Sequence, residues 1–284
     1  LVLEVTSHAL DQNRVHGIDF KIGVVTNITH EHLDYHRSFE NYLRAKSKLL
    51  RSAETAVLNG DDESYGSLKN MLADRNIITY STKDKENYIF PGLAAFNISN
   101  FLAAISVASI VGIDNKIVQK ALDNFKMPEG RQEVVYDKGF RIIIDFAHTP
   151  NAFQNILSEV KKSIKGRLIH VFGCAGLRDK SKRPLMGEIS AKYSNIILLT
   201  AEDPRSEKIE DINIQIKLGI KDYKGELLEI FDRQEAINKA IQIAQKGDIV
   251  IITGKGHEKS MNLGHGEEPW SDHEAVKKAL KLGA

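Results

Sequence analysis

The sequence predicts an α/β protein built from two domains, each with a mainly parallel sheet. Its 284 residues are about two domains' worth at roughly 150 residues per domain. Short runs of β-branched residues alternate with helix-length amphipathic stretches, the pattern of parallel strands joined by crossover helices. The segment Met127–Gly130 contains a proline and a glycine, which interrupt regular structure. We therefore place the boundary there and expect domains at residues 1–128 and 129–284.

The first half should hold a small parallel sheet. We expect strands at Leu1–Val5, Ile22–Thr26, Ala56–Leu58 and Ile77–Tyr80, and helices at Phe39–Arg51, Ser64–Ala73, Asn97–Val111 and Asn115–Asn124. The apolar segment at residues 1–5 has the composition of a buried strand and has neither an initiator methionine nor the basic start of a signal peptide. We therefore expect the chain to be a fragment of a longer protein.

The second half should begin with a β-hairpin, Glu133–Tyr136 and Phe140–Asp145, with Gly139 in its turn. Strands are then expected at Leu168–Phe172, Ile196–Thr200, Leu227–Phe231 and Ile249–Thr253, alternating with helices near 151–164, 183–193, 209–219 and 233–246. This alternation predicts a Rossmann-like domain. In such domains ligands bind beyond the carboxyl ends of the strands.

Charge and composition exclude several classes of protein. The chain has 39 Lys and Arg against 38 Asp and Glu, a net charge of +1, so no basic field favours nucleic acid or an anionic membrane. The single cysteine, Cys174, cannot form an internal disulfide. No apolar run approaches the roughly 20 residues that span a bilayer. We expect a cytoplasmic protein without nucleic-acid or membrane partners.

The densest polar cluster, Thr26–His36, follows an expected strand and contains three histidines. A zinc site needs a closed set of ligands, and these histidine spacings are not diagnostic of one. Together with Glu4, at the end of a neighbouring expected strand, the cluster fits an oxygen-rich magnesium site better. A capping or loop role for each histidine stays open.

Two asparagines, Asn97 and Asn100, open a very apolar helix. Asn97 could be an N-cap. Since residues three apart share a helix face, the pair could instead hydrogen-bond the edge of a nucleobase.

Three polar turns follow strands of the second half: Gly173–Pro184, Glu202–Arg205 and Gly254–Glu258. The first is glycine-rich and basic, a composition that suits a carboxylate or phosphate, but it lacks the Gly-x-Gly-x-x-Gly spacing of dinucleotide sites. Each turn alone is ordinary. Three of them along one sheet edge predict a binding site.

The order and spacing of these motifs resemble the Mur ligase family over nearly the whole chain, and above all its branch that adds the third residue of the peptidoglycan stem. The resemblance implies a partial central ATPase domain at 1–128 and a C-terminal amino-acid-binding domain at 129–284. It implies an ATP- and Mg²⁺-dependent amide ligase, acting through an acyl phosphate. The substrates it implies are UDP-N-acetylmuramoyl-L-Ala-D-Glu and a diamino acid, with meso-diaminopimelate favoured, and we expect a monomer.

The resemblance assigns roles to residues of the first half. Glu4 and His32 match magnesium ligands, and Lys46 matches the lysine that the family carbamylates. A carbamate would turn this lysine into an anionic oxygen ligand for the metal. Positions matching contacts of the UDP-linked substrate are Thr6, Gln12 and Arg14.

Further matches concern the nucleotide and the amino acid. Asn97 and Asn100 match the adenine-recognition segment, and Asp145 matches a ribose contact. Arg131 matches an interdomain arginine that meets phosphate and belongs with the catalytic residues. Positions matching the pocket for the incoming amino acid are Arg178, Asp203, Arg205, Gly254 and Glu258.

The sequence departs from the family pattern in four places. The phosphate loop Gly-Thr-x-Gly-Lys-Thr and the uridine-binding domain are absent, so we expect this chain alone to be inactive. Glu31 replaces the usual aspartate before His32, and Asp203 replaces the asparagine of Asp-Asn-Pro-Arg. The segment Ser81–Ala95 is shorter than the family's insert. The second replacement leaves open whether the amino acid is diaminopimelate, lysine or another diamino acid.

Two other functions remain open. One is a related ligase of the folylpolyglutamate or cyanophycin type, which shares the ATPase core. The other is a non-catalytic module that keeps only the amino-acid pocket. Arg178, Arg205 and Glu258 together favour the peptidoglycan branch.

Overall fold

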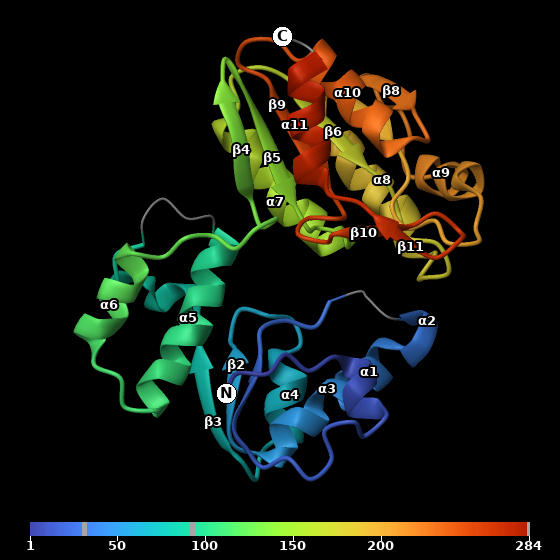
Figure 1. The fold of residues 1–284 in the computed structure, drawn as a ribbon. Helices are drawn as coiled ribbons and strands as arrows, with labels where there is room; N and C mark the ends of the chain where they lie inside the picture. The colour runs from blue at the N-terminus through green and yellow to red at the C-terminus, as the bar shows by residue number, and fades with distance from the viewer. Residues whose placement is uncertain (30–32, 91–94, 283–284) are drawn as a thin grey trace. The chain divides into compact units, whose positions relative to one another are not determined.

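The computed structural model describes residues 1–29, 33–90 and 95–282 (Figure 1). These residues form two compact units, Leu1–Lys126 and Met127–Ala284. The division lies next to the Pro- and Gly-containing segment at residues 127–130. Across the described ranges, no helix is long and apolar enough to cross a membrane.

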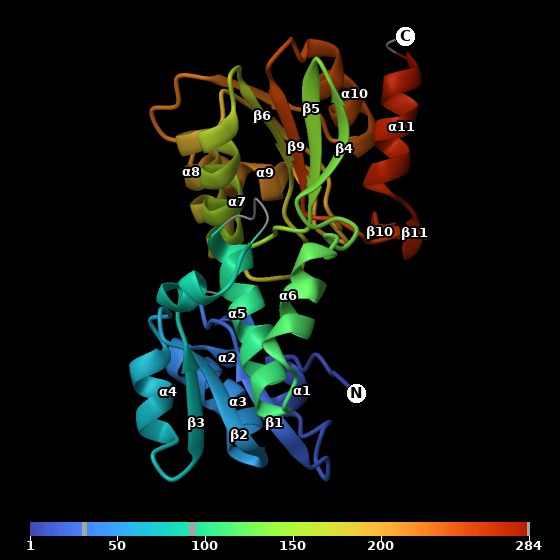
Figure 2. The same ribbon diagram turned by 90° about the vertical axis from the view of Figure 1, so that its left-hand side faces the viewer.

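Unit 1 is built around a three-stranded parallel sheet in the order β1-β2-β3. Its elements are α1 (Ser7–Asp11), β1 (Phe20–Val25), α2 (Leu33–His36), α3 (Phe39–Ser52), β2 (Ala53–Asn59), α4 (Tyr65–Met71), β3 (Asn76–Tyr80), the 3₁₀ helix η1 (Thr82–Asn87), α5 (Ala95–Ile110) and α6 (Asn115–Asp123). Helices cover both faces of this sheet (Figures 1 and 2).

The alternation of side chains along β2 explains the two layers of helices. Ala56 and Leu58 face a core that includes Leu50 of α3 and Leu68 of α4. Val57, between them, faces a second core formed with α5 and α6. Since neighbouring side chains of a strand point to opposite faces, the central strand is apolar on both sides.

The prediction of a strand at Leu1–Val5 is wrong. These residues have no regular secondary structure, and Leu1 and Val2 are almost fully exposed. A strand needs a neighbouring backbone with which to exchange hydrogen bonds, and among the described residues β1 pairs with β2 alone. Apolar composition does not supply that partner.

Unit 2 contains a six-stranded sheet in the order β4-β5-β9-β6-β7-β8, in which only β4 is antiparallel to its neighbour. Its elements are β4 (Glu133–Lys138), β5 (Phe140–Asp145), α7 (Pro150–Ser163), β6 (Leu168–Phe172), α8 (Lys182–Tyr193), β7 (Ile196–Leu199), α9 (Ile209–Lys217), β8 (Glu226–Glu229), α10 (Arg233–Ile243), β9 (Ile249–Thr253), β10 (Ser260–Asn262), β11 (Glu267–Pro269) and α11 (Asp272–Leu282). The predicted α/β fold with a Rossmann-like second half is confirmed.

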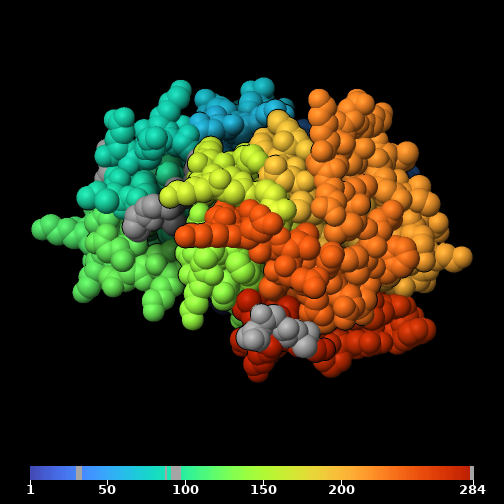
Figure 3. Space-filling model, turned by 90° about the horizontal axis from the view of Figure 1, so that it is seen from above, coloured from blue at the N-terminus to red at the C-terminus, as the bar shows by residue number. Residues whose placement is uncertain are grey.

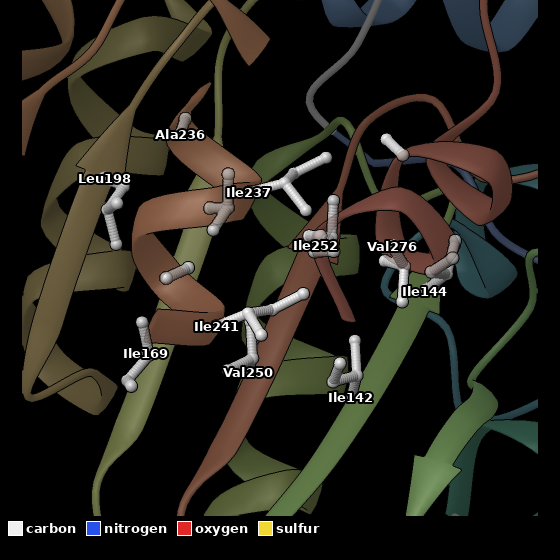
Figure 4. Packing of buried hydrophobic residues seen from close by; sticks show 14 of the residues in the cluster. Ile142, Ile144, Ile169, Leu198, Ala236, Ile237, Ile241, Val250, Ile252 and Val276 are labelled. Carbon is white, nitrogen blue, oxygen red and sulfur yellow. The ribbon is translucent and has the colours of Figure 1, made fainter. Parts of the chain in front are cut away.

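The centre of unit 2 is the buried face between its sheet and α10. Ile237 and Ile241 of α10 pack on Val250 and Ile252 of β9, and Val276 of α11 extends this core (Figure 4). The space-filling view shows α11, in red, against the orange segment that includes α10 (Figure 3). Helices α7 and α8 cover the other face of the sheet (Figure 2). The core therefore fixes the ends of β6, β7 and β9, after which the polar turns follow.

Candidate active site

The three polar turns predicted in the second half lie at one edge of the unit 2 sheet. They follow β6, β7 and β9, which are parallel and contiguous in the order β9-β6-β7. The turns after β6 and β7 are joined directly: Gly176 N–H donates to the Asp203 carbonyl at 2.9 Å, and Arg205 donates to the Gly176 carbonyl at 2.6 Å. The structure thus brings the expected amino-acid-binding turns together.

A buried lysine joins the turn after β7 to the turn after β9. Lys255 is 1% exposed, and its Nζ lies 2.9 Å from Asp203 Oδ1 and 2.7 Å from Glu258 Oε2. Asp203 also accepts the backbone N–H of Asn262 at 2.9 Å. The charge of Asp203, which could have attracted an ammonium group, is therefore paired within the protein. Sequence reasoning missed Lys255, although its place between two glycines was a signal.

The two arginines expected to bind the amino acid differ in exposure. Arg205 is half-buried and is held by its contact with Gly176, whereas Arg178 is exposed. Three non-glycine residues of these turns have left-handed backbone: Leu177 (φ 55°), Asp203 (φ 43°) and Arg205 (φ 51°). Such conformations are costly for non-glycine residues and concentrate at functional sites.

Glu202 is a buried carboxyl group that sequence reasoning did not single out. Burial raises its pKa to about 7, and its Oε2 has no hydrogen-bond partner among the described residues. It packs on Gly254, where a Cβ would lie 2.6 Å from Glu202 Oε2 and where φ is +106°. Glycine at 254 therefore makes room for this carboxyl group. A local pattern gave no sign that this glutamate is buried.

Two of the residues expected to meet the nucleotide, Arg131 and Asp145, lie near the start of unit 2. The Arg131 guanidinium stacks 4.5 Å from the centre of the Phe146 ring, a favourable cation–π arrangement. Asp145 accepts backbone N–H groups from Gln132 at 2.8 Å and Ala147 at 2.7 Å. Burial raises the pKa of Asp145. Its carboxylate thus links the residue that follows Arg131 to the segment that follows β5.

In unit 1, two of the expected substrate contacts, Thr6 and Gln12, flank α1 as its N-cap and C-cap residues. Thr6 caps this helix, because its Oγ1 accepts the Ala9 N–H at 3.1 Å. Gln12 donates to the Tyr35 hydroxyl at 3.3 Å, and Arg14 is exposed. Thr6 therefore has a structural role that its sequence position did not reveal.

A basic hollow lies beside α1. It is lined by Asp11, Tyr35, His36, Arg37, Asn41, Arg44, Ala45 and Lys48. Within it, Lys48 pairs with Asp11 at 3.2 Å, and His36 Nε2 lies 2.9 Å from Ser7 Oγ. Burial lowers the pKa of His36, which favours its neutral form. The cationic lining suits an anionic group of a ligand.

Two of the expected metal ligands, Glu4 and Lys46, are among the described residues. Glu4 is exposed in the irregular first segment, and Lys46 is half-buried on α3. His32 and Glu31 lie outside the described residues. Within the part of the chain that the structure describes, no three His, Cys, Asp or Glu residues form a group that could hold a metal. Since His30, Glu31 and His32 of the histidine cluster lie outside the described residues, its zinc and magnesium interpretations stay predictions.

The two asparagines of α5 differ in environment. The helix begins at Ala95, so Asn97 lies inside its first turn and is not the N-cap. Asn97 is buried and Asn100 is exposed. Their spacing still places them on one face of the helix, which is compatible with contact to a flat ligand.

Comparison with known proteins gives matches on both units. The family model of the Mur ligase middle domain matches residues 1–92, and that of the Mur ligase glutamate ligase domain matches residues 130–256. The UDP-N-acetylmuramoyl-L-alanyl-D-glutamate--2,6-diaminopimelate ligase of Aquifex aeolicus is 40% identical over 305 residues. The enzyme of the same name from Caldanaerobacter subterraneus is 38% identical over 307 residues. Each alignment covers 99% of this chain and 63% of the relative.

Solved structures give the same grouping. A diaminopimelate ligase structure is 33% identical, with a TM-score of 0.55, covering 99% of this chain and 64% of the other. A pseudomurein peptide ligase type C from Methanothermus fervidus shares the fold at 19% identity and a TM-score of 0.70, covering 98% of this chain and 66% of the other. With both of its units matched, the chain belongs to the Mur ligase family.

Proposed function

We propose that the chain is the central and C-terminal part of an ATP-dependent ligase that joins meso-diaminopimelate to UDP-N-acetylmuramoyl-L-Ala-D-Glu. Relatives at 38% and 40% identity carry this activity in their names. The chain spans about 63% of their length. In this proposal residues 1–128 are the remaining central ATPase domain, and residues 129–284 bind the incoming amino acid.

The reaction consists of two transfers. The substrate carboxylate attacks the γ-phosphorus of ATP and releases ADP, which gives an acyl phosphate. The amine of the diamino acid then attacks the acyl carbon, and inorganic phosphate leaves through a tetrahedral intermediate. Positioning and charge stabilisation dominate such phosphoryl transfers.

The observation that carries the proposal is the charge balance of the amino-acid pocket. Arg178, Arg205 and Lys255 supply three positive charges, and Asp203 and Glu258 supply two negative ones. Lys255 pairs with both acidic groups, with Asp203 at 2.9 Å and with Glu258 at 2.7 Å. We assign Arg205 and Arg178, which these two pairs do not use, to the far carboxylate of diaminopimelate. Lysine has no carboxylate at that end, so it would place an ammonium group beside these arginines.

The roles of residues in unit 1 and of those at the nucleotide are also proposals. Glu4, His32 and a carbamate of Lys46 would hold Mg²⁺, which would screen the charge of the phosphates. Asn97, Asn100, Arg131 and Asp145 would contact ATP. Thr6, Gln12, Arg14 and the basic hollow beside α1 would contact the UDP-linked substrate.

The alternatives have weaker support. Folylpolyglutamate synthase structures share the fold at 18% identity and a TM-score of 0.66, which speaks for the fold alone. A non-catalytic module would keep the amino-acid pocket without the ATP reaction. A cytoplasmic location, a monomeric state and the absence of nucleic-acid and membrane partners stay predictions.

The test is ligation by a protein in which the chain is joined to the part that the relatives have and this chain lacks. With ATP, Mg²⁺, the UDP-linked dipeptide and meso-diaminopimelate, it should release ADP and form the tripeptide product. Omitting the amino acid should abolish product formation. The 284-residue chain alone should release no ADP above background. A joined protein that binds diaminopimelate but never forms product would instead support the binding module.

A further inference from the structure

A fully buried ion pair lies behind the amino-acid pocket. Arg233 is the first residue of α10 and Asp272 the first residue of α11, and both side chains are 0% exposed. Arg233 Nε donates to Asp272 Oδ1 at 2.8 Å and its Nη2 donates to Oδ2 at 2.7 Å. The indole N–H of Trp270 donates to Asp272 Oδ1 at 2.9 Å. This bidentate geometry fixes the plane of the guanidinium group.

The remaining donors of Arg233 reach two strand ends. Its Nη1 donates to the Ala201 carbonyl at 3.1 Å, and its Nη2 donates to the Thr253 carbonyl at 2.9 Å. Ala201 directly precedes the turn Glu202–Arg205, and Thr253 directly precedes the turn Gly254–Glu258. One side chain thus contacts the residue before each of two of the three turns assigned to the pocket.

The sheet itself does not join these two strand ends. In the order β9-β6-β7, β6 separates β7 from β9, so no ladder hydrogen bond links them. Yet the ion pair between Lys255 and Asp203 requires the two turns to stay close enough for Lys255 Nζ to reach Asp203 Oδ1, which lies 2.9 Å away. Arg233 supplies a fixed connection across β6.

We propose that the Arg233–Asp272 pair is a positioning device for the amino-acid pocket, which sets the spacing between the turn after β7 and the turn after β9. This inference rests on the proposed function of the pocket. A buried ion pair contributes little net stability compared with apolar residues of similar size. Because the pair contacts both strand ends, it also sets the distance between them, in addition to filling the core.

The same strand offers a matched control at its other end. Arg167 pairs with Asp248 at 2.7 Å and donates to the Ile243 carbonyl at 2.8 Å. Asp248 directly precedes β9, so this pair also ties the strand to its surroundings. It lies at the amino end of β9, away from the pocket turns. A merely structural role would give both pairs similar consequences.

The experiment measures hydrogen exchange and diaminopimelate binding in the 284-residue chain. In Arg233→Met/Asp272→Leu, we expect at least tenfold faster exchange in residues 202–206 and 254–259 and at least tenfold weaker binding of meso-diaminopimelate. In Arg167→Met, faster exchange should be confined to the residues around 245–248, and the Kd should stay within twofold. If the double variant does not fold, the same exchange measurement is made on Asp272→Asn. We then expect at least threefold faster exchange in the same two turns.

Unchanged exchange in the pocket turns would overturn the positioning role, and so would equal effects of both arginine substitutions on those turns. Failure of the unaltered chain to bind diaminopimelate would count against the proposed function instead. The exchange measurement would still decide the role of the ion pair, because it needs no ligand.

Discussion

Replacing Glu202 by glutamine should remove a pH dependence of stability that we expect for the wild-type chain between about pH 4.5 and 7. Burial raises the pKa of this carboxyl group from 4.5 to about 7. The folded state therefore holds its proton at pH values where the unfolded state has released it. The stability associated with the protonated group is complete below pH 4.5 and is lost as pH rises through 7.

The magnitude follows from the size of the change in pKa. At about 1.4 kcal/mol for each tenfold change in proton affinity, a rise from 4.5 to about 7 corresponds to about 3 kcal/mol. Glutamine has nearly the same shape and no charge. The stability of Glu202→Gln relative to wild type should therefore increase by about 3 kcal/mol between pH 4.5 and pH 8.

The assay is urea unfolding followed by the fluorescence of Trp270, the single tryptophan of the sequence. It lies in unit 2 and donates to Asp272, so its emission reports the unfolding of that unit. Glu207→Gln is the control, because the Arg183 hydrogen bond lowers the pKa of Glu207 to about 2 and its contribution is constant from pH 5 to 8. The reasoning is refuted if the difference in unfolding free energy between wild type and Glu202→Gln is equally constant from pH 5 to 8.

Two further predictions concern single residues. Gly254→Ala should destabilise unit 2 by about 1–3 kcal/mol, because φ at this residue is +106° and the new Cβ would contact Glu202. Gly139 also has a positive φ but has open space around it. Gly139→Ala should therefore destabilise unit 2 less, as measured in the same fluorescence assay. In the joined protein, Lys46→Ala should lower kcat while leaving the melting temperature near that of wild type, with partial rescue by short carboxylates. Full activity of that variant would reject the carbamate role.

Local sequence patterns were sufficient where burial and regular structure coincide. The bounds predicted for β6 and β9 agree with the structure, because each is a short apolar run buried on both faces. The same reasoning failed at Leu1–Val5, where no neighbouring strand is described, and it missed α11 and the β10–β11 hairpin. Apolar composition predicts a preference for burial. It does not show whether a neighbouring strand is present to pair with.

The proposed amino-acid pocket shows a second limit of sequence reasoning. Position at strand ends and family resemblance pointed to Arg205 and Glu258, and the structure brings their turns together. Lys255 and Arg233 were missed, since their partners Asp203 and Asp272 lie 52 and 39 residues away in the sequence. Which charges pair inside the protein depends on strand order. A single sequence read by local pattern does not contain that order.

The most direct test of the proposed amino-acid pocket is calorimetric titration of the chain with meso-diaminopimelate and with lysine, for wild type and for Arg205→Ala. A charged hydrogen bond contributes about 1.5–3 kcal/mol, which corresponds to about 10- to 100-fold discrimination. We expect wild type to prefer diaminopimelate by that factor and Arg205→Ala to lose most of the preference. Tighter binding of lysine, unchanged by Arg205→Ala, would contradict the account.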